Sequence, residues 1–138
     1  MPVDSPLSHV IQKNASEIRR LHDRVHATWR FRGRSAEENT AWKDACAEFH
    51  QRYDGLAFPG GYRGALDRIV AGDATTVEAA LSFVECRPFF FRSGYMFKDL
   101  LRKLKRAPLD NANALRLQSV LDAYAAYRSQ RRGRTARA

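Results

Sequence analysis

The spacing of apolar residues constrains the fold of this chain more than any other feature of the sequence. From Arg87 to Arg106 the chain reads RPFFFRSGYMFKDLLRKLKR, and its second half places apolar side chains at i, i+3, i+4 and i+7. These residues are Phe97, Leu100, Leu101 and Leu104. This period forms one apolar stripe on an α-helix, whereas a half-buried β-strand alternates every second residue. We therefore predict an amphipathic helix in this stretch.

The first half of the same stretch predicts a sharp turn between two helices. Pro88 cannot occupy a helix interior, and Gly94 tolerates backbone angles that other residues avoid. We expect one helix to end near Arg87 and the next to be capped near Ser93. The three phenylalanines Phe89–Phe91 lie between these helices and are expected to belong to the core.

Helical periods recur along the rest of the chain and predict six helices. Ser35 with Glu38, and Thr75 with Glu78, form capping-box pairs that mark helix starts. Phe89–Phe91 is the one run with strand propensity, and it is too short to make a sheet. The predicted helices cover about 8–30, 35–53, 62–71, 75–86, 95–106 and 111–127.

Short connections between these helices predict an all-α fold of three antiparallel hairpins packed as a compact helical bundle. Residues 62–86 and 95–127 each form helix, turn and helix, offset by about 35 residues. That spacing loosely resembles HEAT or TPR repeats, although no TPR signature residues align, and the resemblance would imply a short solenoid. We expect a flexible arm over 1–7, one helical domain over 8–127 and a disordered basic tail over 128–138, which lacks an apolar period.

Composition favours a cytoplasmic protein. The chain has two cysteines, which are too few for a disulfide framework, so we expect free thiols in a reducing compartment. The N-terminus carries an acid where a signal peptide has positive charge. The sequence contains no run of about 18 apolar residues, which a membrane-spanning helix would need. We therefore expect no membrane insertion.

Charge is distributed unevenly along the sequence. The net charge is +9, but residues 35–86 are acidic, with four Lys or Arg against nine Asp or Glu. Residues 87–138 carry thirteen Lys or Arg, three Asp and no Glu, which gives this last third a net charge of +10. Such asymmetry indicates an anionic partner: nucleic acid, an acidic protein or a membrane surface. We favour nucleic acid or an acidic protein. A solvated surface rich in arginine would produce the same composition.

Two groups of residues in the basic third are candidate anion ligands. The first surrounds the predicted helix start, where unpaired amides and the helix dipole favour negative charge; its members are Arg87, Arg92, Ser93 and Gly94. The alternative is that Arg92 is solvated or pairs with Glu85. The second group lies opposite the apolar stripe and in the tail: Lys98, Arg102, Lys105, Arg106, Arg131, Arg132 and Arg134.

Sequence motifs that would indicate a metal site, a catalytic site or a cofactor are weak or missing in this chain. His22 and His26 are one helical turn apart, a spacing that can bind a metal, but the general-base glutamate of the HExxH motif is missing. A partly buried, hydrogen-bonded histidine pair is the favoured alternative. No nucleophile motif or cofactor fingerprint is present, so we expect no cofactor and lean against an enzyme.

Three functions remain open from the sequence. The leading hypothesis is a non-enzymatic binding module whose basic third binds nucleic acid without strong sequence specificity. The second is a protein-interaction module, such as an adaptor or an immunity-like protein, that uses the acidic segment 35–86 or the phenylalanine-rich corner. The third is an enzyme that uses the Arg87–Gly94 corner or the His22/His26 pair. The oligomeric state is left open.

Overall fold

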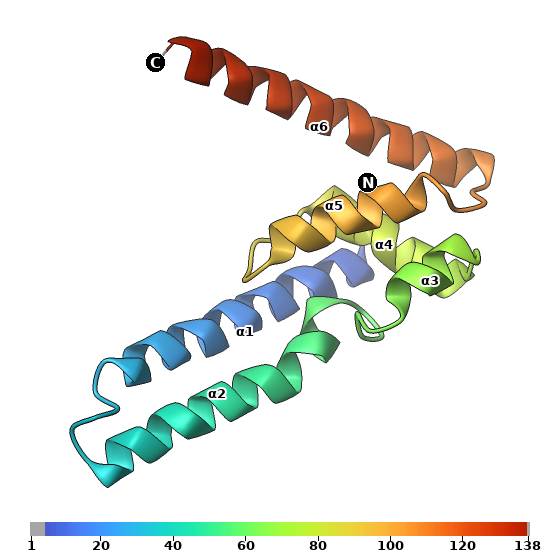
Figure 1. Cartoon of the computed structure of the whole chain (residues 1–138). Helices are drawn as coiled ribbons and strands as arrows, with labels where there is room; N and C mark the ends of the chain where they lie inside the picture. The colour runs from blue at the N-terminus through green and yellow to red at the C-terminus, as the bar shows by residue number, and fades with distance from the viewer. Residues whose placement is uncertain (1–4, 138) are drawn as a thin grey trace.

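The computed structural model describes residues 5–137, with side chains described as far as Gly133. This part of the chain contains six helices and no strand, which confirms the all-α prediction. The helices are α1 (Pro6–Trp29), α2 (Ala36–Ala57), α3 (Ala65–Val70), α4 (Ala74–Cys86), α5 (Ser93–Leu104) and α6 (Asn111–Arg137) (Figure 1). None of these helices combines the length and the apolar character that crossing a bilayer requires.

The first two helices, α1 and α2, lie side by side over most of their lengths (Figure 1). Ser35 is the N-cap of α2, as predicted, because its Oγ accepts a hydrogen bond from the Glu38 amide at 3.1 Å. The Glu38 carboxylate accepts a hydrogen bond from the Ser35 hydroxyl at 3.3 Å. Arg52 joins the two helices by pairing with Glu17 of α1 at 2.9 Å.

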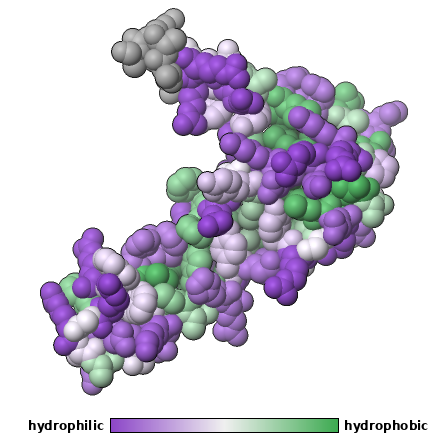
Figure 2. Space-filling view, viewed as in Figure 1, coloured by the Kyte–Doolittle hydropathy of each residue, from purple (hydrophilic) through white to green (hydrophobic). Residues whose placement is uncertain are grey.

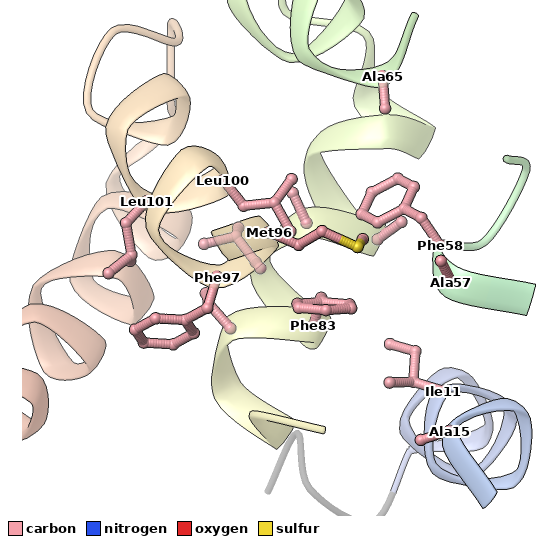
Figure 3. Close-up of a cluster of buried hydrophobic side chains, with 14 of the residues drawn as sticks. Ile11, Ala15, Ala57, Phe58, Ala65, Phe83, Met96, Phe97, Leu100 and Leu101 are labelled. Atoms are coloured by element: carbon pink, nitrogen blue, oxygen red, sulfur yellow. The ribbon is translucent and has the colours of Figure 1, made fainter. Parts of the chain in front are cut away.

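Helix α4 is the centre of the core. Its side chains are buried nearly all round, from Val77 to Val84, because α4 contacts α1, α3, α5 and α6. Phe83 of α4 lies near Ile11 of α1 and Met96 of α5 in the close-up of the core (Figure 3). A helix that is apolar on every face requires neighbours on every face. The contacts therefore do not divide into three separate pairs, and the hairpin and solenoid arrangements remain predictions.

The start of α4 differs from the sequence-based expectation. Asp73 is the N-cap, and its carboxylate accepts hydrogen bonds from the Thr76 amide at 3.0 Å and the Thr76 hydroxyl at 2.5 Å. The predicted Thr75 and Glu78 capping box is therefore wrong. Asp is as good an N-cap as Thr or better, and Asp73 follows Gly72, whose φ of +84° ends the preceding turn.

The turn between α4 and α5 buries only one of its three phenylalanines. Phe90 is 5% exposed and packs against Phe83, whereas Phe89 and Phe91 are 78% and 41% exposed. The prediction that all three belong to the core is wrong. A tight turn cannot direct three consecutive side chains to the same side, so only the middle ring enters the core.

Helix α6 is anchored to α4 near its N-terminal end. Arg116 donates to Glu85 at 2.7 Å and to Glu78 at 2.5 Å, and these hydrogen bonds raise the pKa of its guanidinium. Among the described residues of α6, Leu117 is the one that is buried, with 7% of its surface exposed. The C-terminal part of α6 projects away from the rest of the molecule (Figure 1).

The first helix begins earlier, and the last helix ends later, than the sequence predicted. Helix α1 begins at Pro6, inside the expected flexible arm, with Ser5 as its N-cap. Helix α6 continues to Arg137 through the segment expected to be a disordered tail. Arginine, glutamine and alanine are good helix formers, so the helix propagates without an apolar stripe. The remainder of the expected arm, residues 1–4, and residue 138 lie outside the described residues.

Candidate functional site

A groove of about 1690 Å³ lies between α5, the turn that precedes it and α6. In Figure 2 the molecule is hollowed between the projecting end of α6 and the rest of the chain, and hydrophilic residues gather on α6 beside this hollow. Its lining includes eight cationic residues: Arg87, Arg92, Lys98, Arg102, Lys105, Arg128, Arg131 and Arg132. We call this surface the basic groove.

Helix α5 contributes one complete face to the basic groove. Tyr95, Lys98, Arg102 and Lys105 recur at intervals of three or four residues and are all exposed. This spacing places them on one side of an α-helix, while Leu100 and Leu104 on the other side are buried in the core. The predicted phase of this helix is therefore correct. Arg102 pairs with Asp99 at 2.7 Å, but its side chain remains 65% exposed.

Helix α6 supplies the opposite wall. Its groove-facing residues begin as an apolar stripe at Leu121 and Tyr124 and continue at the same spacing with Arg128 and Arg131. Tyr124 packs edge-on against Phe97 of α5, with ring centroids 5.2 Å apart. The apolar part of the stripe joins α6 to α5. The arginine part extends the wall into solvent.

Arg87 occupies the junction of α4, α5 and α6. Its guanidinium lies over the rings of Phe97, Tyr124 and Tyr127, at 4.6, 5.3 and 4.5 Å from their centroids. Stacking of an arginine on aromatic rings contributes about 0.5 to 2 kcal/mol, depending on how far the pair is desolvated. Arg87 therefore has a structural role beside the role predicted for it in anion binding.

Ser93 and Arg92, both predicted anion ligands, lie at the start of α5 in different environments. Ser93 is 6% exposed, and its hydroxyl accepts a hydrogen bond from the Phe90 amide at 3.0 Å. This bond closes the turn, so the Ser93 hydroxyl is already engaged. Arg92 is exposed and lies beside the Phe91 ring. The suggested alternative pairing with Glu85 is absent from the described residues, because Arg116 binds Glu85.

The basic groove contains most of the predicted ligands but not all of them. Arg106 follows the end of α5 and does not line the groove. The Arg134 side chain lies outside the described residues. Gly94 lines the groove, as do Arg128 from the predicted basic tail and three exposed aromatic residues that were not predicted as ligands, Phe89, Tyr95 and Tyr127. Tyr95 could have been recognised from the sequence because it is out of phase with the apolar stripe of its helix, whereas Tyr127 continues an apolar period and resembles a core residue.

Among the described residues no Asp, Glu, His or Cys lines the basic groove. Several acids of the acidic segment 35–86 instead have structural partners within the fold. Glu48 pairs with Arg24 and Arg52, Glu78 and Glu85 pair with Arg116, and Asp73 caps α4. Three of the nine acids of this segment therefore form ion pairs within the fold, and none of the nine lines the groove. The groove lining described here therefore contains cationic, aromatic, aliphatic and small side chains but no carboxylate, imidazole or thiol.

The histidine pair lies apart from this groove lining. The His22 and His26 rings are 4.6 Å apart and edge-on, and His22 stacks on Phe91 with a centroid distance of 4.8 Å. Burial lowers the pKa of His22. The pair is held by ring contacts, and among the described residues the hydrogen bonds expected for it are not found. No group of three or more His, Cys, Asp or Glu in this part of the chain is arranged to hold a metal.

Comparison of the chain with protein-family models, with curated proteins and with solved structures found no match.

Proposed function

We propose that this protein binds nucleic acid in the basic groove, without strong sequence preference and without catalysing a reaction. The observation that carries the proposal is the placement of eight cationic side chains, with no acidic one, along one groove formed by the described residues. Neutralising phosphates with Lys and Arg releases condensed counterions, and this release drives most non-specific binding to nucleic acid.

The size of the groove supports a polymer as its occupant. Pockets for small molecules usually measure about 300 to 1000 Å³, whereas this groove has about 1690 Å³ and opens to solvent. The start of α5 also lies at the groove through Gly94 and Tyr95, so the positive end of its helix dipole adds to the charge there.

The arrangement of the cations favours contacts to phosphates over contacts to base edges. Sequence is read by side chains that enter the major groove on a helix or a strand and pair with base edges. Lys98 and Arg102 instead stand on one wall of a hollow, with Arg128 and Arg131 on the other. Residues that surround a strand from two sides fit its backbone.

The proposal is tested by titrating the full chain into a labelled oligonucleotide and following fluorescence anisotropy at several salt concentrations. With about five phosphates neutralised, the slope of log K against log salt for duplex DNA should be about −4 to −5. Replacing Arg102→Glu together with Lys105→Glu should weaken binding about 100-fold at about 50 mM salt and flatten the slope by about two.

A matched control makes the same change in net charge outside the groove. Lys13 and Lys43 are exposed on α1 and α2 and do not line the groove, so Lys13→Glu with Lys43→Glu should change affinity less than about threefold. Equal losses in both double variants would show that total charge, and not the groove, determines binding. If no binding is detected at about 50 mM salt, nucleic acid is eliminated and an acidic protein becomes the better candidate.

A further inference from the structure

Three exposed aromatic side chains accompany the cations of the basic groove. Phe89, Tyr95 and Tyr127 line it and are 78%, 71% and 43% exposed. Among the described residues, no ring contact and no guanidinium contact is found for Phe89 or Tyr95, so neither ring is covered by another ring or by an arginine. Large aromatic rings exposed together within a groove indicate a binding surface.

The backbone that carries Phe89 is held firmly from three directions. Arg19 of α1 donates a hydrogen bond to the Phe89 carbonyl, and Tyr53 of α2 donates one to the Phe91 carbonyl at 2.7 Å. The Phe90 amide donates to Ser93 within the turn, and the Phe90 ring is buried in the core. The turn is therefore anchored while the Phe89 ring stays in solvent. Binding to a preordered ring loses less conformational entropy than binding to a mobile one.

The chemistry that matches both the rings and the cations is an unpaired nucleic-acid strand. Aromatic side chains stack on the faces of bases, and every base offers such a face. In a duplex those faces are covered by the neighbouring base pairs. An acidic peptide would match the cations, but it carries no regular series of flat rings to stack on Phe89 and Tyr95.

We infer that the basic groove selects single-stranded over double-stranded nucleic acid, with Phe89 and Tyr95 as stacking platforms for unpaired bases and Tyr127 as a third ring that is partly covered by Arg87. This inference rests on the proposed function and adds the class of nucleic acid to it. The cations hold the phosphodiester backbone, and the rings determine that the bases must be unpaired. Single-stranded DNA and RNA share this chemistry.

The test compares the full chain on four labelled probes of about 16 nucleotides: single-stranded DNA, the same sequence as RNA, its DNA duplex, and an abasic DNA strand with the same phosphates. Single strands with bases should bind at least about tenfold more tightly than the duplex and the abasic strand. Phe89→Ala and Tyr95→Ala should each weaken single-strand binding about 5- to 100-fold, while duplex and abasic affinities change less than about twofold.

Two further variants separate stacking from the loss of apolar surface. Tyr95→Phe keeps a ring and should bind single strands like the native chain, whereas Tyr95→Leu keeps apolar area without a ring and should behave like Tyr95→Ala. Phe31→Ala is the matched control, because Phe31 is also an exposed aromatic beside an arginine, Arg34, but does not line the groove. This control should leave single-strand binding unchanged.

The outcomes distinguish the inference from the proposed function. If all probes bind alike, if the duplex binds more tightly, or if the alanine variants weaken every probe equally, the inference is overturned while nucleic-acid binding stands. If no probe binds, the proposed function itself fails. If the single strands bind more tightly than the duplex and the abasic strand, the inference is supported. Comparison of the DNA and RNA single strands then shows which sugar the groove prefers.

Discussion

Arg87 and Arg92 both have a left-handed backbone conformation, with φ of 50° and 67°, one at each end of the turn between α4 and α5. This conformation costs a residue with a Cβ about 1 to 2 kcal/mol, and glycine avoids most of that cost. The two arginines therefore place charge at the groove at some expense in stability. The phenylalanines between them pass from exposed Phe89 to buried Phe90 because the backbone reverses within a few residues.

We predict that Arg92→Gly separates stability from binding. Removing the Cβ should raise the free energy of unfolding by up to about 1 kcal/mol, measured by urea denaturation. The same change removes one groove cation and should weaken nucleic-acid binding about threefold or more. Arg92→Lys keeps both the charge and the backbone strain, so it should leave stability and binding nearly unchanged. A loss of stability in Arg92→Gly would contradict the assignment of strain.

At the scale of the elements, α6 shows how one helix serves two purposes. Its N-terminal part is joined to α4 through Arg116, Glu85 and the buried Leu117. Its C-terminal part is exposed and carries arginines at the same helical spacing. Because tertiary contacts support only the first part, the helical state of the second depends on the intrinsic propensity of its residues.

Gly133 lies inside the exposed part of α6, and a Cβ placed there would contact nothing within 4 Å. Gly133→Ala should therefore stabilise the end of the helix by about 1 kcal/mol. We expect slower amide hydrogen exchange over residues 128–137, by about fivefold, and a small gain in helical circular dichroism. Gly133→Pro is the opposing variant and should increase exchange in the preceding turn. Equal exchange in all three proteins would indicate that this segment is not helical in solution.

The whole molecule combines an internally paired N-terminal half with a basic C-terminal third. Hydrogen bonds from Arg20 and Arg52 lower the pKa of Glu17 to about 2, and hydrogen bonds from Arg24 and Arg52 lower the pKa of Glu48. Burial lowers the pKa of His22. In each case the folded state binds protons less readily than the unfolded chain, so acid favours unfolding.

We predict that the free energy of unfolding falls in two stages as the pH is lowered. The contribution of His22 is present above its ordinary pKa of 6.5 and is lost as the pH falls below that value. The contribution of Glu17 is present above about 4.5 and is lost towards a pH of about 2. Urea denaturation at a series of pH values measures both stages.

Two variants identify the groups responsible. Glu17→Gln should be less stable than the native chain at pH 7, with a difference that disappears towards pH 2. Salt at about 1 M should reduce that difference because the ion pairs are partly exposed. His22→Phe should remove the fall in the free energy of unfolding that begins below pH 6.5. A stability that stays constant between pH 7 and pH 3 would contradict these assignments.

The sequence by itself determined the features that depend on residues close together in the chain. The period of Phe97, Leu100, Leu101 and Leu104 specified a helix and its buried side, because side chains three and four residues apart share a face. The same phase put Lys98 and Arg102 on the exposed side. Ser35 could be recognised as a cap because its partner Glu38 is only three residues away.

The tertiary structure decided everything that depends on which faces meet. It placed α4 at the centre of the core and paired Glu85 with Arg116 of α6, although Arg92 is much closer in sequence. It also divided the phenylalanine run between core and solvent. The basic groove exists only because α6 packs against α5 through Phe97 and Tyr124 and then diverges from it. A helical period shows which side chains share a face, but the neighbour that covers this face is chosen by packing over the whole chain.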